Sequence, residues 1–360
     1  VAVGSGAGAT LITANNTAIG SQALAAASGA DCTAIGYNAL SASITATNNT
    51  AVGSGALALS SATASINNTA IGKGSMGSAN NAGCLQNTAL GSGTLAASAL
   101  ESQDNVAVGF EALNDLTTGD NNTAVGSLAG DALTTGSDNV GIGLNALGAA
   151  TTAVKNTAIG SGSLAGALAT ALGDNNVAVG YTALAANIAA NNTAIGSLAL
   201  ASANHADSQN NTSIGYNSMN GALEAAQCVA IGSGAMAANQ DADDNIAIGY
   251  NALTLSENDV SVNNIAIGAR ALDGANGAGV VANIAIGTDS LGGSLTSGNN
   301  IGIGHDALKV LASGSNNIAI GSSAGDAISG GLYNVAIGTD SLGANTTAGR
   351  NISIGYEALK

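Results

Sequence analysis

Residues 191–200 read NNTAIGSLAL, and nearly the same ten residues occur at 15–24 (NNTAIGSQAL) and at 48–57 (NNTAVGSGAL). The shared pattern, Asn-(Thr/Val/Ile)-Ala-(Ile/Val)-Gly-x-x-(Ala/Ser)-Leu, recurs 21 times at intervals of 16 to 20 residues. A fixed period of this length is typical of solenoids, in which each repeat forms one rung that stacks on its neighbours. Stacking places equivalent residues of successive repeats above one another, in columns that can be named by their distance from the central glycine.

Three columns before the glycine predict a strand. The residue one before the glycine is Ile or Val in every repeat except one, which has Leu90, and the residue three before it is always Thr, Val or Ile. We call these the two β-branched columns. The alanine column between them holds Ala in 17 repeats. Alternate residues of a strand share a face, so we expect the β-branched columns to point into a core and the small face to pack closely against another sheet or chain.

A ladder column stands four residues before the glycine and holds Asn in 18 of the 20 repeats that have this position. Side-chain amides stacked about 4.8 Å apart can donate to one neighbour and accept from the other. We predict such a ladder at Asn16, Asn49, Asn68, Asn105, Asn122, Asn192, Asn264 and Asn317, among others. Cys32 and Cys228 occupy the same column, so we interpret them as small ladder substitutes rather than as nucleophiles or metal ligands.

The glycine suits a backbone with positive φ or a tight bend. Four residues later, a leucine column holds Leu in 15 repeats, Met in three and glycine in three (Gly8, Gly130 and Gly325), which we read as a second core strand. We therefore predict an all-β fold, a parallel β-solenoid or β-roll of about 21 rungs, with two short strands per rung and variable loops on one side. Residues 1–360 form one repeat domain, expected to be a segment of a longer fibre or a filament protomer.

Composition and charge exclude several classes of function. The chain has 52 Gly, no Pro, no Trp and a net charge of −16 with only six basic residues. Scattered basic residues argue against nucleic acid as a partner, and no apolar run is long enough for membrane insertion. Three widely spaced cysteines, including Cys84, do not form a disulfide framework.

The strings NNTAIGSQAL, TAIGYNAL and NNTAVGSGAL closely resemble repeats in the heads of trimeric autotransporter adhesins and in many phage or virus tail-fibre proteins. The resemblance covers the whole chain and is carried by the Asn, Ala, Ile/Val and Gly columns. It implies left-handed parallel β-rolls, commonly three chains about one axis, serving adhesion or host attachment. Repeats here are longer than is usual in autotransporter heads, and the neck, coiled-coil stalk and anchor of those proteins, as well as any tail-fibre chaperone domain, are absent from this sequence.

Two sets of residues are candidates for surface contacts. Aromatic side chains recur in the post-glycine column, directly after the glycine, where they either pack at rung edges or form a stripe that binds carbohydrate or a partner: Tyr37, Phe110, Tyr181, Tyr216, Tyr250 and Tyr356. Asn-x-Ser/Thr sequons, most of them created by the repeat itself, offer glycosylation at Asn15, Asn48, Asn67, Asn121, Asn191, Asn210 and Asn345, each a better acceptor than Asn351 in the ladder column.

Other chemistry has little support in the sequence. The glycines at Gly4, Gly6 and Gly8, or at Gly160 and Gly162, belong to the rung pattern rather than to a phosphate loop. His305 with Asp306 is the nearest approach to a general base, and His205 lies in a loop. Acidic residues recur two positions after the glycine and at Asp241, Asp243 and Asp244, where we expect solvation rather than calcium binding. We expect no cofactor.

These observations lead to a structural hypothesis. We expect a non-enzymatic, extracellular, cell-surface or virion fibre subunit whose main partner is itself, as a homotrimer or a head-to-tail filament. The alternative is a solenoid module that binds surface glycans or another surface. Ice binding would need exposed Thr columns, and we expect the Thr residues here to point into the core. We make the fibre hypothesis depend on burial of the isoleucines beside the glycines.

Overall fold

The computed structural model describes most of the chain, and its fold is all-β. It describes residues 1–9, 15–26, 29–42, 46–58, 65–77, 83–97, 101–166, 173–186, 189–203, 205–221, 224–238, 241–254, 260–274, 279–344 and 346–360. No α-helix occurs in these ranges, and none of their residues forms a helix long and apolar enough to span a membrane. Many residues of the variable loops, such as 59–64 and 167–172, lie outside the described residues. The chain divides into two compact units, residues 1–182 and 183–360.

The first unit is a stack of short strands, one on the Thr-Ala-Ile motif of each repeat. They are β1 (Ala2–Val3), β2 (Thr17–Ile19), β3 (Thr33–Ile35), β5 (Thr50–Val52), β7 (Thr69–Ile71), β9 (Thr88–Leu90), β10 (Val106–Val108), β11 (Thr123–Val125), β12 (Val140–Ile142), β13 (Thr157–Ile159) and β14 (Val177–Val179). Each pairs in parallel with the strand of the next rung, residue for residue, as in Thr17 with Thr33 and Ile19 with Ile35.

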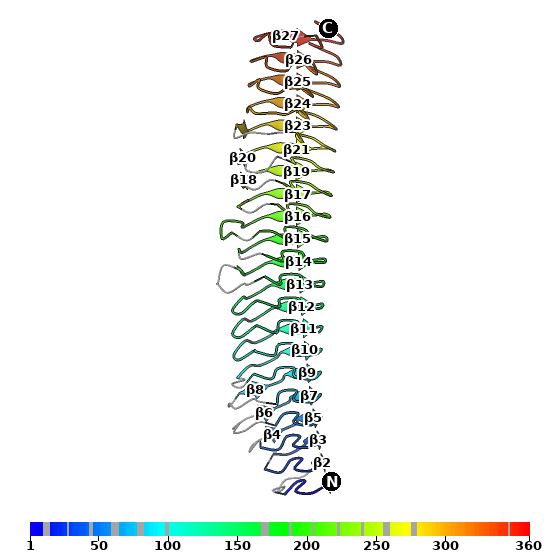
Figure 1. The fold of residues 1–360 in the computed structure, drawn as a ribbon, viewed down its shortest axis with the longest axis vertical. Coiled ribbons are helices and arrows are strands. Elements are labelled where there is room, and N and C mark those ends of the chain that lie inside the picture. The colour runs from blue at the N-terminus through cyan, green and yellow to red at the C-terminus, as the bar shows by residue number, and fades with distance from the viewer. Residues whose placement is uncertain are drawn as a thin grey trace. The chain divides into compact units, whose positions relative to one another are not determined.

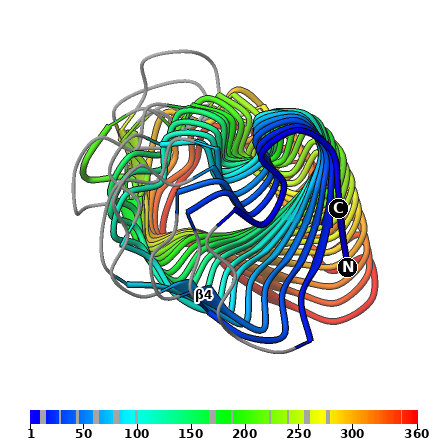
Figure 2. The ribbon, with the colours of Figure 1, turned by 90° about the horizontal axis from the view of Figure 1, so that it is seen from below.

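The second unit repeats this arrangement. Its motif strands are β15 (Thr193–Ile195), β16 (Thr212–Ile214), β17 (Val229–Ile231), β19 (Ile246–Ile248), β21 (Ile265–Ile267), β23 (Ile284–Ile286), β24 (Ile301–Ile303), β25 (Ile318–Ile320), β26 (Val335–Ile337) and β27 (Ile352–Ile354). Pairing is again parallel and in register, for example Ile284 with Ile301. The predicted parallel β-solenoid is therefore confirmed. Within each unit the strands lie one above another and the rungs follow nearly the same path (Figures 1 and 2).

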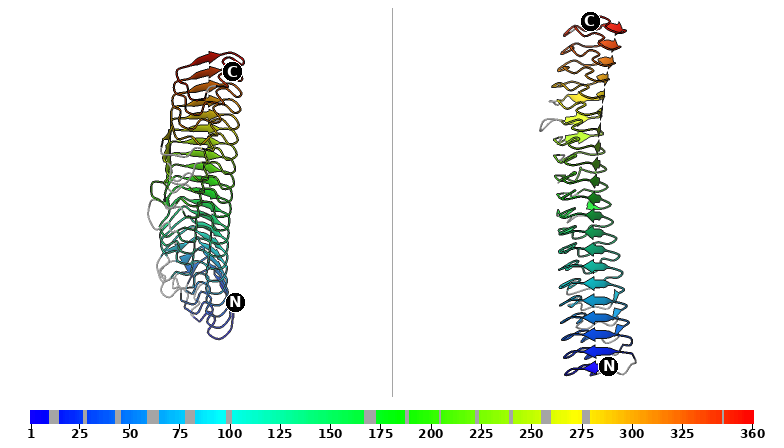
Figure 3. Two further views of the ribbon diagram at one scale, coloured as in Figure 1. Left: turned by 45° about the horizontal axis from the view of Figure 1, so that its top comes forward. Right: turned by 90° about the vertical axis from the view of Figure 1, so that its right-hand side faces the viewer.

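A second strand exists in some rungs, but not where the sequence predicted it. In the first unit β4 (Ala46–Thr47), β6 (Ser65–Ile66) and β8 (Cys84–Leu85) form a small parallel sheet, and in the second unit β18 (Asp241–Asp243), β20 (Val260–Val262) and β22 (Val280–Val281) form another. All precede the ladder column. The leucine column instead lies in a turn. Figure 3 shows the motif strands of each unit stacked in a row. The prediction of a strand after the glycine was wrong.

The turn nevertheless stacks from rung to rung. The backbone N–H of Leu24 donates to the carbonyl of Ala39 in the next rung at 3.0 Å, and that of Leu40 donates to Ala56 at 2.9 Å. Both leucines have φ near +50°, a left-handed conformation that is rare for a large side chain. This geometry explains why glycine stands in the leucine column at Gly130 and Gly325, whose φ values are +59° and +61°.

The predicted core face was also reversed. The alanine column is buried, while the β-branched columns point outward and are half-buried or exposed, as for Thr17 and Ile19 on either side of the fully buried Ala18. A Cβ added at Gly141, in the alanine column, would lie 3.2 Å from Cδ1 of Leu147 in the same rung. The small face therefore packs against the leucine column of its own chain, because the narrow interior has room there only for Ala, Gly or Ser.

The central glycines have the predicted special backbone. Gly53, for example, has φ +136°, and an added Cβ would lie within 3.0 Å of the backbone of Gly72, the equivalent residue of the next rung. Left-handed backbone and lack of space thus act together to require glycine.

Candidate functional surfaces

Within each unit the ladder column forms a buried hydrogen-bond network, as predicted. The eight asparagines named from the sequence are all buried. Oδ1 of Asn49 accepts from the backbone N–H of Asn68 at 2.8 Å and from its Nδ2 at 3.2 Å. Nδ2 of Asn68 also donates to the carbonyl of Cys84 at 2.8 Å. Each rung is thereby fixed to the next through a side chain as well as through its strands.

The acceptor of that last bond belongs to a column that the sequence analysis missed. Seven residues before most of the glycines stands a small residue, and its carbonyl accepts from the ladder side chain of the preceding rung, as at Gly119 from Asn105 and at Ala153 from Asn139. The signal in the sequence is the run of small residues at this distance, including Ser65 and Cys84. The residues are small because they are buried against the ladder.

Cys32 and Cys228 behave as ladder substitutes, as predicted. Sγ of Cys228 donates to the carbonyl of Ala242 at 3.2 Å, the bond that Nδ2 of an asparagine makes elsewhere. All three thiols are buried, and burial raises the pKa of Cys84 and of Cys228 to about 12 and also raises the pKa of Cys32. The thiolate is the reactive form, so burial leaves these cysteines unreactive near neutral pH.

The outward columns carry exposed and half-buried apolar side chains along both units. In the first unit the column three before the glycine is mostly Thr, and in the second it is Ile or Val in every motif strand from β17 onward. The isoleucines beside the glycines are about 36–40% exposed at several rungs, such as Ile159, Ile231 and Ile320. Since Thr17, Thr33 and their equivalents face outward rather than into a core, the argument made above against an ice-binding surface was wrong.

The aromatic candidates all lie at the surface. Tyr37, Phe110, Tyr181, Tyr216, Tyr250 and Tyr356 are 52–74% exposed. They stand beside the outward isoleucine column, with only the glycine between, as Ile35 and Tyr37 do. An exposed ring beside an exposed aliphatic side chain is typical of an interface or of a carbohydrate-binding surface.

The sequon asparagines occupy one further outer column, directly before the ladder. Six of them are exposed and have a left-handed backbone conformation, with φ between 58° and 66°: Asn15, Asn48, Asn67, Asn121, Asn191 and Asn210. Their side chains also pair between rungs, as Nδ2 of Asn48 does with Oδ1 of Asn67 at 3.0 Å. Asn345 lies outside the described residues, and Asn351 is half-buried in the ladder. The left-handed backbone explains the repeated Asn-Asn pair, since Asn tolerates this conformation well.

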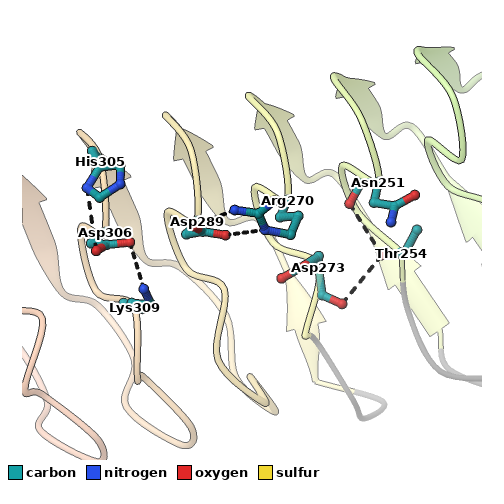
Figure 4. Close-up of polar contacts among 8 residues, drawn as sticks. All are labelled: Asn251, Thr254, Arg270, Asp273, Asp289, His305, Asp306 and Lys309. Carbon is teal, nitrogen blue, oxygen red and sulfur yellow. Dashed lines mark hydrogen bonds and ion pairs between the residues drawn. The ribbon is translucent and has the colours of Figure 1, made fainter.

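Charged residues meet on the turns of the second unit (Figure 4). Arg270 donates two hydrogen bonds to Asp289, at 2.6 and 2.8 Å, and this pairing lowers the pKa of Asp289. Lys309 donates to Asp306 at 3.0 Å, and Nδ1 of His305 lies 3.4 Å from the same carboxylate. His305 and Asp306 are thus brought together, but on an open surface and beside a lysine.

Asp289, His305 and Asp306 each offer one potential ligand atom within 4.8 Å of the others. Both carboxylates already accept hydrogen bonds from cations of the chain: Asp289 from Arg270 of the preceding rung, and Asp306 from Lys309 of its own rung. His205 lies apart from it, near Asp207 and Glu224. No protein-family model matches the chain, and neither does any curated protein.

Proposed function

We propose that this chain is a structural subunit of an extracellular fibre or appendage. The observation that carries the proposal is the ladder, which binds rung to rung inside both units with the same register of side chain and backbone, as between Asn300 and Asn317. A stack held by bonds repeated at every rung suits a scaffold that must resist bending and local unfolding. The isoleucines beside the glycines face outward, so the burial on which the sequence analysis made the fibre hypothesis depend is not found. The proposal rests instead on the in-register stacking of the rungs.

The polar chemistry of the described residues agrees with a structural role. The thiols are buried and protonated, and the carboxylates nearest to His305, those of Asp289 and Asp306, are already paired with Arg270 and Lys309. A net charge of −16 keeps such a surface soluble. Location at a cell surface or virion, and kinship with adhesin heads or tail fibres, belong to this proposal through the resemblance of the repeats.

The test is an image of the purified chain. Negative-stain electron microscopy combined with a mass measurement should show elongated particles whose length scales with the number of rungs. A variant lacking one whole repeat, residues 247–265, should give rods shorter by one rung and no weaker in thermal stability per rung. Compact round particles, or loss of folding on removal of a single repeat, would contradict a stacked scaffold.

A second candidate is a module that binds a carbohydrate surface through the aromatic column, favoured by the exposure of all six rings. Exchanging Tyr216 and Tyr250 for Ser, the residue that stands after the glycine at Ser197 and Ser233, keeps the turn while removing the rings. Retention of the wild-type chain on an insoluble polysaccharide, and its loss in this variant, would support the candidate. Equal behaviour of both proteins would contradict it.

A further inference from the structure

A small hollow lies between the rungs of β26 and β27 in the second unit. It has a volume of about 290 Å³ and is lined by Leu332 and Tyr333 of one rung and by Gly349 and Arg350 of the next. The two rungs are stacked in register there, because the backbone N–H of Arg350 donates to the carbonyl of Leu332 at 2.8 Å. Ligand sites in proteins begin at about 300 Å³, so the hollow has room for one small ring.

Two of these residues depart from the repeat. The pre-ladder column, five residues before each glycine, holds Asn, Asp or Gln in 16 of its 20 repeats, but Tyr333 and Arg350 in these two. Both have a left-handed backbone, with φ of 58° and 63°, which suits Asn better than Tyr or Arg. Both side chains are exposed, so packing of the core does not require them either. The two departures coincide with the hollow, which points to binding rather than folding as their role.

Arg350 is available to an external anion. Arg270, Lys309 and Lys360 each form an ion pair with a carboxylate of the chain, whereas Arg350 forms none with the residues that the structure describes. A guanidinium offers a planar pair of donors that matches the two oxygens of a carboxylate. The group that fits beside Arg350 is therefore a carboxylate.

The rest of the ligand has to cover both apolar and polar side chains. The ring of Tyr333 is 55% exposed and the side chain of Leu332 is 43% exposed, so a bare inorganic anion would leave this apolar wall uncovered. Further along the pre-ladder column stand Asn316 and Asn299, which are exposed and have the same left-handed backbone. Side-chain amides both donate and accept, as the hydroxyl groups of a sugar require, and an aromatic ring packs against the apolar face of a sugar ring.

We infer that the hollow binds an acidic carbohydrate, in which the carboxylate of a uronate pairs with Arg350 and its ring packs against Tyr333. Further sugar units lie along the pre-ladder column over Asn316 and Asn299. At about 4.8 Å per rung, these four side chains span about 14 Å. The site is distinct from the aromatic column, since the two columns stand at opposite ends of each motif strand. It does not depend on the proposed structural role, because it needs only the stacking of these rungs.

The experiment titrates the full chain with a trisaccharide of galacturonate and with the neutral galactose trisaccharide of the same linkage. Isothermal titration calorimetry follows binding up to about 10 mM ligand. The test variants are Arg350→Gln and Tyr333→Gln. Gln stands in this column at Gln86 and Gln227 with a left-handed backbone, so the fold should tolerate it. The matched control is Lys155→Gln, which removes one exposed positive charge from the same column outside the hollow.

We expect the wild type to bind the acidic trisaccharide with a Kd of about 1 mM or lower, and the neutral one at least about tenfold more weakly. Arg350→Gln should reduce the affinity for the acidic sugar to that for the neutral one, and Tyr333→Gln should weaken the binding of both. Arg350→Lys should restore only part of the affinity, because it keeps the charge without the planar pair of donors. Binding of the acidic sugar should also weaken between about 0.05 M and about 0.5 M salt, because salt screens an exposed ion pair.

Unchanged melting temperatures of the variants establish that a loss of affinity reflects the hollow rather than the fold. Absence of binding by the wild type, equal affinity for the two sugars, or an equal loss in Lys155→Gln would overturn the inference. The variant without the rings of Tyr216 and Tyr250 should bind the acidic trisaccharide as the wild type does. Elongated particles that bind no uronate would leave the proposed scaffold intact, whereas compact particles would contradict the scaffold itself.

Discussion

Asn139 makes two hydrogen bonds to one atom of Asn122, the side-chain oxygen Oδ1, from its backbone nitrogen at 3.1 Å and from its Nδ2 at 3.0 Å. Its Nδ2 also donates to the carbonyl of Ala153 at 2.7 Å. The same arrangement recurs along the ladder, so a single side chain satisfies buried groups of three neighbouring rungs.

Removing one ladder amide should therefore be costly. We expect Asn139→Ala to lower the free energy of unfolding by about 2–4 kcal/mol, because it leaves buried donors and acceptors without partners. Asn139→Cys should cost less, since Cys228 shows that a thiol can donate to the same kind of carbonyl. Chemical denaturation checks the order, with Asn145→Gly at an exposed left-handed position as the control. Equal costs for Ala and Cys would contradict this account of the cysteines.

Gly72 and Gly74 in one rung should respond in opposite ways. Gly72→Ala should strongly destabilise the fold, by several kcal/mol, because φ is +138° and the new Cβ would meet the backbone of Gly91. Gly74→Asn should be nearly neutral, because φ is +63° and open space surrounds that position. The melting temperatures of the two variants test this difference. An unchanged melting temperature for Gly72→Ala would contradict the close contact between the backbones of Gly72 and Gly91.

Gly130 and Leu133 should form a coupled pair. An added Cβ at Gly130 would lie 2.9 Å from Cδ2 of Leu113 and 3.1 Å from Cδ1 of Leu133, so Leu133 fills the space that the leucine column fills in other rungs. We expect Gly130→Leu alone to overpack the core and so to lower the free energy of unfolding by about 1–3 kcal/mol. Adding Leu133→Ala should recover part of that loss. A double-mutant cycle measures the coupling, and strict additivity would contradict the exchange of one leucine for the other.

Replacing Asp326 with a neutral residue should raise the stability of the fold by an amount that depends on pH. Burial, and then the carboxylate of Asp340, raise the pKa of Asp326 above its ordinary value. The folded state therefore holds the proton more firmly than the unfolded state, and this contribution to stability is lost as pH rises through the raised pKa. Asp326→Asn should raise stability at pH 7 by no more than about 1 kcal/mol after solvent screening, and the gain should vanish at acidic pH. Melting curves across pH check it, with exposed Asp241→Asn as control.

The three thiols should be inert in the folded protein. With the pKa of Cys84 and Cys228 raised to about 12 by burial, a thiol reagent at pH 8 should label none of the cysteines until denaturant is added. Spectrophotometric titration with such a reagent gives the number of labelled thiols per chain directly. Rapid labelling of one thiol in the native protein would show that the ladder opens there.

The stacked fold could be predicted because its evidence is periodic. The positions of Asn16, Gly20 and their equivalents fixed the period, the ladder and the special glycine backbone without knowledge of any contact. The register followed from the same columns, since pairing Thr17 with Thr33 is the only alignment that keeps every column intact.

The orientation of the strand could not be predicted, because a preference for strands does not specify which face is buried. Ile19 is a typical core residue, yet the interior next to the strand is too narrow for it and accepts Ala18 instead. The turn after the glycine escaped prediction for a related reason: a leucine such as Leu24 rarely adopts positive φ, and only stacking on Ala39 makes that conformation favourable. The outward apolar face was missed as a consequence.

The two ladder cysteines bear on how the protein would yield under tension. Strands run across each stack, so the bonds between rungs point along it and a pulling force loads the rung interfaces in series. Failure then begins at the weakest link. At Cys228 a sulfur, a poor acceptor, replaces the amide oxygen that elsewhere holds the backbone of the next rung, and Cys32 repeats this in the first unit. Each unit thus contains one rung boundary with a weaker ladder bond, and under tension this boundary would separate before the others.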